Sequence, residues 1–343
     1  MYQKLIKPLL FRLPIDKAHA TALWLLRLVG LLPYGHRILR ASYRTDHPSL
    51  EREVFGIKFR NPVGLAAGFD CDGDVINEVG AIGFGFVEIG SITPEPQEGN
   101  PKPRVFRLTK DNAIVNRIGQ ANRGWRYAIE NLRKEHTDIV VGCNISVGAQ
   151  THPKQAAQDY LKSFRTLYQY SDYFTVNLTQ DNAALSAKSY TAQSLAATLA
   201  PLFEFRRGQS EYRPIMVKIS PDDGIEVLDM VISVLIDTPL DGIVAVGGTR
   251  SREGLRTSQL SLSKIGTGRL SGAPLQARAI EVVRYIHQKT NGAYPIIGVG
   301  GIWSAEGAKQ MLEAGASLVQ VYSGLIYEGP SVAKRICQSL IEQ

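Results

Sequence analysis

The sequence of 343 residues lacks the features that mark secreted, disordered or nucleic-acid-binding chains. Its three cysteines, Cys71, Cys143 and Cys337, are too few and too dispersed for a disulfide framework, which favours reduced thiols in a cytoplasmic compartment. There is no low-complexity run, no block of like charge and no long Gly/Ser linker, so we expect an ordered chain. The net charge is +7, but the basic residues are scattered and no nucleic-acid-binding motif is present.

The N-terminal 45 residues hold two short apolar stretches, and neither is long. Residues 1–12 carry Lys4, Lys7 and Arg12 and no acidic residue, and a second apolar stretch covers 20–32. Neither stretch reaches the roughly 20 apolar residues that span a bilayer, and we expect no signal peptide. The pattern predicts amphipathic helices that lie on a membrane surface. A helical pair docked on the main domain is the alternative.

From residue 60 onward, short apolar runs alternate with helix-like segments. Continuous apolar runs of this length are typical of parallel strands buried on both faces. Eight such units predict one α/β domain, a (β/α)8 TIM barrel over 46–343, preceded by a helical extension over 1–45. An open doubly wound sheet is the alternative, but no GxGxxG fingerprint supports it. The runs are 63–68, 86–92, 139–146, 173–179, 214–220, 242–248, 295–302 and 318–324.

The ends of these runs carry the functional signal, because a TIM barrel places its chemistry at the carboxyl ends of its strands. The first run ends in Ala66-Ala67-Gly68, the seventh in glycines 298, 300 and 301, and the eighth in Tyr322-Ser323-Gly324. Small residues let backbone N–H groups approach a ligand closely, and the loops after strands seven and eight often bind phosphate. The pattern predicts a phosphorylated cofactor; tight turns made for packing are the alternative.

A lysine and several asparagines also lie at the strand ends. Lys218 interrupts an apolar run, and a buried ammonium needs an anionic neighbour. That neighbour is either a structural carboxylate or a ligand that becomes negative, as a flavin does on reduction. Asparagine offers both a donor and an acceptor, which suits the amide edges of a flavin or a pyrimidine. The asparagines are Asn116, Asn144, Asn177 and Asn182.

Several stretches together resemble the class 2, quinone-linked dihydroorotate dehydrogenases, and the likeness runs almost from end to end. The stretches are FRNPVGLAAGFD, GFGFVEIGSITPEPQEGNPKPRVFRL, LSGAPL, PIIGVGGI and AGASLVQVYSG. The resemblance implies an FMN-dependent oxidoreductase of the CH–CH class, whose family reaction converts dihydroorotate to orotate in pyrimidine biosynthesis. It further implies a quinone as electron acceptor, an N-terminal extension that forms the quinone tunnel, and peripheral attachment to the cytoplasmic, inner face of the membrane.

The resemblance also implies roles for single residues, and it implies no metal. FMN would contact Ala67, Gly68, Ser91, Asn144, Asn177, Lys218, Gly272, Gly301, Tyr322 and Ser323. The substrate would contact Cys71, Asn116, Gly119, Gln120, Asn177, Asn182, Gly247 and Gly248. The quinone path would be lined by His19 and Arg107, with an ordinary surface ion pair as the alternative for Arg107.

The residues that would contact the substrate, here called the substrate half of the site, depart from the family's pattern. The family's AAGxDK lysine, which meets the substrate carboxylate, is Cys71, and its NRxGFNN stretch reads NRIGQAN at 116–122. The serine base of NxSSPN is replaced by Gln180, whose amide does not accept a proton at neutral pH. The family's Thr-Asn-Thr/Ser reads VGG at 246–248, so two binding side chains are lost, and a glycine before LSG is Arg269.

The candidate catalytic residues are Gln180, Thr179 and Lys218. The departures allow three interpretations of what the protein does. We first expect a diverged paralogue that oxidises another small substrate. The alternative is a working dihydroorotate dehydrogenase with an atypical site, and the third reading is a flavin- or quinone-binding protein without turnover. Thr179 has a hydroxyl, but neighbouring strand residues face opposite sides, so we expect it to serve as base only if the strand bulges.

Overall fold

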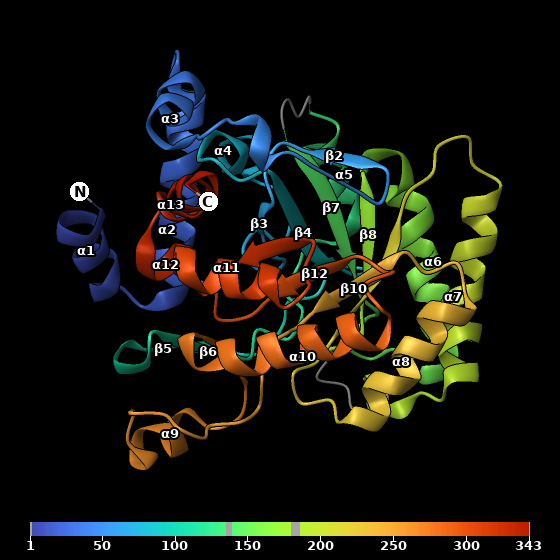
Figure 1. Ribbon diagram of the computed structural model, residues 1–343. Helices are drawn as coiled ribbons and strands as arrows, with labels where there is room; N and C mark the ends of the chain where they lie inside the picture. The colour runs from blue at the N-terminus through green and yellow to red at the C-terminus, as the bar shows by residue number, and fades with distance from the viewer. Residues whose placement is uncertain (1, 135–138, 180–185, 343) are drawn as a thin grey trace.

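The computed structural model describes residues 2–134, 139–179 and 186–342, and it shows a closed barrel of eight parallel strands (Figure 1). Each strand pairs with its neighbours in chain order, and β13 pairs back with β3 to close the ring. The predicted fold class is confirmed, and each of the eight predicted runs contains one strand. The strands are β3 (Val63–Leu65), β4 (Phe86–Ile92), β7 (Val140–Ile145), β8 (Tyr173–Asn177), β9 (Ile215–Ile219), β10 (Gly242–Ala245), β12 (Ile296–Val299) and β13 (Leu318–Val321).

Helices surround the barrel and cover the outer faces of its strands (Figure 1). They bury their apolar sides against the strands, which is why the strands themselves read as continuous apolar runs. The helices are α4 (Ile76–Ala81), α5 (Gly124–Leu132), α6 (Ala156–Leu167), α7 (Ala192–Arg207), α8 (Ile225–Asp237), α10 (Gln276–Lys289), α11 (Ala305–Glu313), α12 (Ser323–Glu328) and α13 (Val332–Ile341).

Large side chains fill the barrel interior at its amino-terminal end. Phe86 and Tyr173 are fully buried there, and each ring lies where the side chain of a neighbouring strand would otherwise be. A Cβ atom at Gly64 would lie 2.3 Å from the Phe86 ring, and one at Gly142 would lie 2.1 Å from the Tyr173 ring. A short hairpin of β1 (Arg52–Val54) and β2 (Ile57–Phe59) adds apolar residues to the same cluster.

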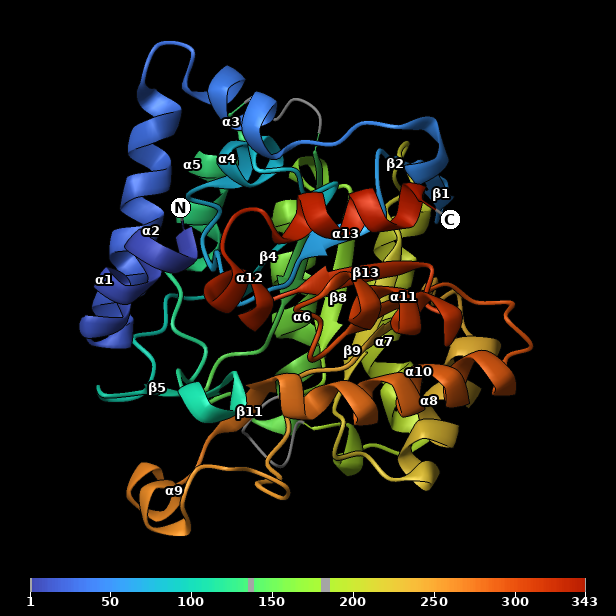
Figure 2. The same cartoon turned by 60° about the vertical axis from the view of Figure 1, so that its left-hand side comes forward.

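A second, three-stranded sheet in the order β11-β6-β5 was not predicted from the sequence. It consists of β5 (Val105–Leu108), β6 (Ala113–Asn116) and β11 (Arg269–Gly272), paired antiparallel. The chain between β10 and β11 carries α9 (Gln259–Ile265), which projects away from the barrel (Figure 2). The sheet therefore brings residues near 116 and near 270 together beside the barrel.

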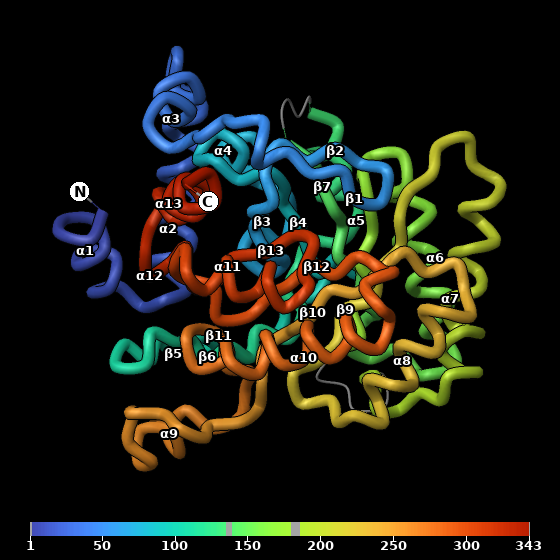
Figure 3. Tube along the Cα trace, in the orientation of Figure 1, coloured from blue at the N-terminus to red at the C-terminus, as the bar shows by residue number. Residues whose placement is uncertain are grey.

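The N-terminal segment is helical and lies along one side of the barrel, next to the C-terminal helices (Figure 3). It comprises a π-helical turn (Tyr2–Ile6), α1 (Lys7–Arg12), α2 (Ile15–Leu31) and α3 (Gly35–Tyr43). Most of the exposed large apolar side chains of the described residues belong to this segment: Leu5, Leu9, Leu13, Trp24, Leu25, Leu28, Leu31, Leu32, Tyr34 and Ile38. Within the described ranges, no helix is both long and apolar enough to cross a membrane.

We expect Gly142→Ala to destabilise the barrel by about 1–3 kcal/mol, because the added Cβ overlaps the fully buried Tyr173 ring. Urea unfolding followed by circular dichroism measures the change. Gly208→Ala is the matched control, since Gly208 is exposed and its Cβ would meet a single atom at an ordinary 3.6 Å. Equal midpoints for the two variants would contradict the packing argument.

Candidate active site

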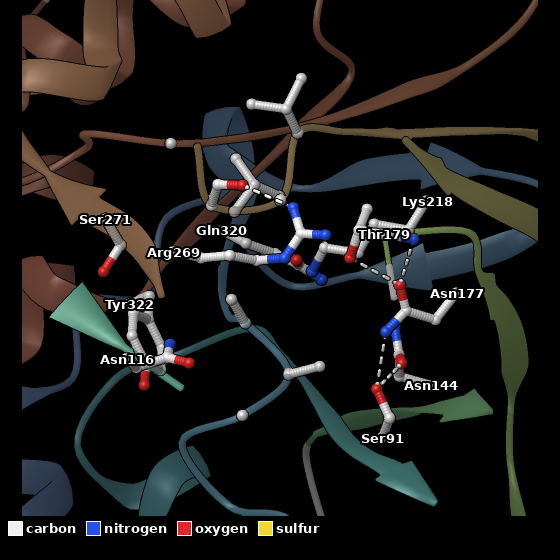
Figure 4. Close-up of a pocket in the computed structure, with 18 of the residues that line it drawn as sticks. Ser91, Asn116, Asn144, Asn177, Thr179, Lys218, Arg269, Ser271, Gln320 and Tyr322 are labelled. Atoms are coloured by element: carbon white, nitrogen blue, oxygen red, sulfur yellow. Dashed lines mark hydrogen bonds between the residues drawn. The ribbon is translucent and has the colours of Figure 1, made fainter. Parts of the chain in front are cut away.

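A cavity at the carboxyl ends of the barrel strands collects nearly all of the predicted cofactor and substrate residues (Figure 4). Its wall includes the ends of barrel strands and the sheet β11-β6-β5. All predicted cofactor contacts line it: Ala67, Gly68, Ser91, Asn144, Asn177, Lys218, Gly272, Gly301, Tyr322 and Ser323. The predicted substrate contacts in it are Cys71, Asn116, Gly119, Gln120, Asn177, Gly247 and Gly248. Gln180 and Asn182 lie outside the described residues.

Glycines and unpaired polar atoms make one part of this cavity suitable for a flat, phosphorylated ligand. Gly68, Gly272 and Gly301 have φ angles of 96°, 117° and 71°, which residues with a side chain rarely adopt. The buried Ser271 Oγ and Gln320 Oε1 have no hydrogen-bond partner among the described residues. Buried polar atoms are normally paired, so these two indicate that a polar ligand completes the site.

A fully buried glutamate, Glu88 on β4, lies beneath this cavity and was not singled out from the sequence. Asn144 Nδ2 donates to its Oε1 at 2.8 Å, and Gln320 Nε2 donates to its Oε2 at 2.9 Å. The hydroxyl groups of Thr175 and Tyr173 donate to Oε2 at 3.1 and 3.4 Å. These donors offset the large cost of removing a carboxylate from water.

Lys218 on β9 faces this glutamate, so it has a structural partner as well as a place in the cavity wall. Its Nζ lies 3.9 Å from Glu88 Oε1, and its side chain is only 9% exposed. Burial lowers the pKa of Lys218, whereas the nearby charge of Glu88 raises it. Glu88 therefore helps to keep the ammonium charged at the floor of the cavity.

A chain of hydrogen bonds joins the residues predicted to contact the cofactor to those predicted to contact the substrate. Ser91 Oγ donates to Asn144 Oδ1, and Asn177 Nδ2 donates to Ser91 Oγ at 2.9 Å. The backbone N–H and the hydroxyl of Thr179 both donate to Asn177 Oδ1, at 2.9 and 2.7 Å. Thr179 lies beyond β8, which ends at Asn177, and it lines the cavity two residues later; its service as a base stays a prediction.

Cys71 cannot replace a lysine electrostatically. Burial raises the pKa of its thiol to about 12, and the neighbouring carboxylates act in the same direction. The group is therefore neutral at physiological pH, and its Sγ approaches the Gly68 carbonyl oxygen at 3.8 Å. Gln120, also in the wall, donates to Ser146 Oγ at 2.8 Å. Both positions now present neutral groups to the substrate half.

The two glycines after β10 leave space that other side chains occupy. A Cβ at Gly247 would lie 3.0 Å from Thr179 Cγ2, and a Cβ at Gly248 would lie 3.0 Å from Arg269 Cβ. Arg269 Nη1 also donates to the Gly248 carbonyl oxygen at 3.1 Å. Thr179 and Arg269 thus occupy the space beside Gly247 and Gly248, where the family's pattern has larger side chains.

A separate apolar cavity of about 280 Å³ lies between the N-terminal helices and the barrel. His19 and Arg107, the two residues predicted for the quinone path, both line it, and the path itself stays a prediction. His19 Nε2 bonds to the Phe69 carbonyl oxygen at 2.8 Å, and burial lowers the pKa of its imidazole. Arg107 donates to the carbonyl oxygens of Leu13 and Phe11, at 2.9 and 3.2 Å, where α1 ends. Its bonds to the N-terminal helix replace the surface ion pair weighed as the alternative.

Comparison with protein families gives one match that covers most of the chain. The model described as dihydroorotate dehydrogenase matches residues 49–343. The match thus covers the whole barrel, including every strand, and begins after the N-terminal helices.

Curated relatives and solved structures agree with this match. A protein called dihydroorotate dehydrogenase (quinone) from Christiangramia forsetii is 42% identical over 100% of this chain and 99% of its own length. One of the same name from Roseiflexus sp. is 39% identical over 98% of this chain and 92% of its own length. The crystal structure of DHODH from Eimeria tenella in complex with ferulenol is similar with a TM-score of 0.85 at 32% identity, covering 95% of this chain and 90% of its own. The likeness includes the N-terminal residues that the family model leaves out.

We expect Glu88→Gln and Lys218→Met each to destabilise the protein by about 3–5 kcal/mol, because each leaves a buried charge without its partner. The double variant should lose clearly less than the sum of the two, and urea unfolding of all four proteins measures this coupling. The control cycle uses the exposed pair Lys162–Glu95, for which we expect about 1 kcal/mol or less. Additive losses at Glu88 and Lys218 would show that the pair is not coupled.

Proposed function

This chain belongs to the dihydroorotate dehydrogenase family, and on that premise we propose that it binds FMN, oxidises dihydroorotate to orotate and passes the electrons to a quinone. The observation that carries the proposal is that all the predicted FMN contacts line one cavity at the carboxyl ends of the barrel strands. The full-length relatives, which carry the name dihydroorotate dehydrogenase (quinone), favour dihydroorotate over the different substrate that the sequence alone placed first.

The residues present fit FMN. The positive φ angles of Gly272 and Gly301 let the backbone approach a phosphate, and Ser323 adds a hydroxyl close by in the wall. Ser271 Oγ and Gln320 Oε1, which lack hydrogen-bond partners among the described residues, gain them from the polar groups of the cofactor. When bound, FMN supplies a two-electron acceptor that becomes negative on reduction, and Lys218 is the cation available to stabilise that charge.

The protein's own side chains orient the substrate and carry its proton. Asn116 and Asn177 line the cavity and offer both donors and acceptors to a pyrimidine ring. Thr179 contributes the hydroxyl of the substrate half, and its hydrogen bond to Asn177 Oδ1 fixes its rotamer. We assign Thr179 the role of relaying the substrate proton to water. In the family's pattern this role belongs to a serine at the next position along the chain.

A different small substrate is the second candidate, and specific observations favour it. Cys71 is a neutral thiol where the resemblance implies a lysine, and Gly247 and Gly248 have lost the side chains that would contact a pyrimidine. The cofactor half and the acceptor cavity are the same under both candidates. The two candidates therefore differ only in what reduces the flavin.

The N-terminal helices are proposed to carry the quinone and to hold the protein on the cytoplasmic face of a membrane. Their exposed side includes Trp24, Leu28 and Leu31, which lie on one face of α2 at helical spacing and are 60%, 40% and 75% exposed. The apolar cavity beneath them is near the lower limit of small-molecule pockets, about 300 Å³. A quinone dissolved in the lipid could enter this cavity without crossing water.

We expect the purified protein to be yellow, with about one FMN per chain, and dihydroorotate to bleach it under anaerobic conditions at about 10 per second. Thr179→Val should slow this bleaching by about 10²-fold or more, because the proton relay is lost. Stopped-flow absorbance measures both rates. Thr198→Val is the control, since that hydroxyl bonds within the exposed face of α7.

Slow or absent bleaching of flavin-loaded wild-type protein would instead support the second candidate substrate. Bleaching that Thr179→Val leaves unchanged would remove Thr179 from the proton path while leaving the overall reaction in place.

We expect Trp24→Glu/Leu31→Glu to weaken binding to anionic vesicles by at least about 10-fold, because two apolar side chains no longer enter the bilayer interface. Co-sedimentation measures binding, which should also weaken with salt. Ile225→Glu/Leu260→Glu is the matched control, since both residues are exposed apolar side chains of the barrel, 61% and 68% exposed. Equal binding by the two double variants would contradict a membrane role for the N-terminal helices.

A further inference from the structure

A third pocket lies where the loop that carries α9 returns to the β11-β6-β5 sheet (Figure 2). Its volume of about 630 Å³ is within the range of small-molecule sites. None of the described residues that line it also lines the active-site cavity or the apolar cavity. The lining residues are Asn100, Arg117, Arg250, Arg252, Gly266, Thr267 and Gly268.

The wall of this pocket is cationic. It contains three arginines, and no carboxylate is among the described residues that line it. The other lining residues are a threonine, an asparagine and two glycines, so the wall offers no apolar or aromatic surface. Like charges gathered in one pocket repel one another, and an anion among them would offset this repulsion. The composition of the wall therefore favours an anionic ligand.

Backbone carbonyl oxygens hold two of the three arginines in place. Arg117 Nη1 donates to the Ile265 carbonyl oxygen at 2.5 Å, and its guanidinium lies 4.8 Å from the centre of the Phe106 ring. Arg252 Nη2 donates to the Gly268 carbonyl oxygen at 2.6 Å. A carbonyl oxygen orients a guanidinium but does not neutralise it. These two charges are therefore positioned before any ligand binds, which lowers the entropic cost of binding.

The third arginine, Arg250, is exposed, and its side chain makes no hydrogen bond, ion pair or ring contact with the described residues. The carboxylate of Asp222 contacts the same loop but does not line the pocket: it accepts from the Thr249 hydroxyl and, at 2.9 Å, from the Arg250 backbone N–H. Burial lowers the pKa of Arg252, and the charge of Asp222 raises it by less. An additional anion would therefore stabilise the charged form of Arg252.

We propose that this pocket binds the diphosphate group of a small soluble ligand. A guanidinium offers paired N–H donors that match phosphate oxygens, and a diphosphate carries enough oxygens and charge to face all three arginines. Because the wall has no apolar or aromatic surface, recognition depends on the phosphate groups and not on what they are attached to. The site goes beyond the proposed function and does not depend on which substrate reduces the flavin.

Calorimetric titration of the purified full-length protein with inorganic pyrophosphate, in magnesium-free buffer of low ionic strength, tests this site. We expect one pyrophosphate per chain, bound more tightly than orthophosphate and less tightly as salt is added. Arg250→Gln should weaken pyrophosphate binding by about 10-fold, because one charge-assisted contact is lost. It should leave the melting temperature unchanged, since the Arg250 side chain has no contact of its own within the described residues.

Matched variants separate a site from a general attraction of anions to a basic protein. Arg207→Gln removes the same charge from the exposed end of α7, on the opposite side of the barrel, and should leave pyrophosphate binding unchanged (Figure 1). Thr267→Glu places a carboxylate in the pocket and should weaken binding at least about 10-fold relative to Thr267→Gln, which has the same size and no charge.

The proposal is overturned if the wild type binds no pyrophosphate at millimolar concentration, or if Arg250→Gln and Arg207→Gln weaken binding equally. Vesicles that contain phosphatidic acid test a lipid headgroup as the other source of phosphate. We expect Arg250→Gln to bind these vesicles as the wild type does. If it binds them more weakly while the wild type binds no pyrophosphate, the pocket is a lipid site, and the soluble diphosphate ligand is overturned.

Discussion

The buried carboxylate of Glu88 is the group around which the rest of the active end of the barrel is arranged. It lies on β4, and its partners come from β7, β8, β9 and β13. An ionised carboxylate in an apolar interior is stable only if donors and a cation surround it, so these strands must meet in one register. The same requirement places Asn144 and Lys218, which line the cavity above it. Stability and function therefore share one set of side chains.

The barrel could be predicted from the sequence because its strands are buried on both faces, and burial leaves a continuous apolar run in each of them. The sheet β11-β6-β5 could not, since its strands are short and β11 follows β6 only after about 150 residues, and no local pattern marks a pairing at that distance. Glu88 was missed for a related reason. The role of a single acidic residue in an apolar strand depends on hydrogen-bond donors that come from other strands, and these are known only once the strands are placed.

The substrate half shows where single-residue comparison misleads. Read one position at a time, Gly247, Gly248 and Arg269 are three unrelated departures from a family pattern. In the structure the glycines make room for Thr179 and Arg269. Most of the predicted substrate residues line the cavity, but the sequence does not show that the replacements fit one another. Gln180 and Asn182, on which that reasoning also relied, lie outside the described residues.

The two cavities lie on opposite sides of a shared wall. Gly68 lines the polar cavity and Phe69 the apolar one, and the same holds for Ser323 and Leu325 at the start of α12. Under the proposed function, the oxidisable substrate and the electron acceptor therefore do not need to occupy the same space. The described residues that depart from the family's pattern all line the polar cavity and not the apolar one: Cys71, Gln120, Gly247, Gly248 and Arg269.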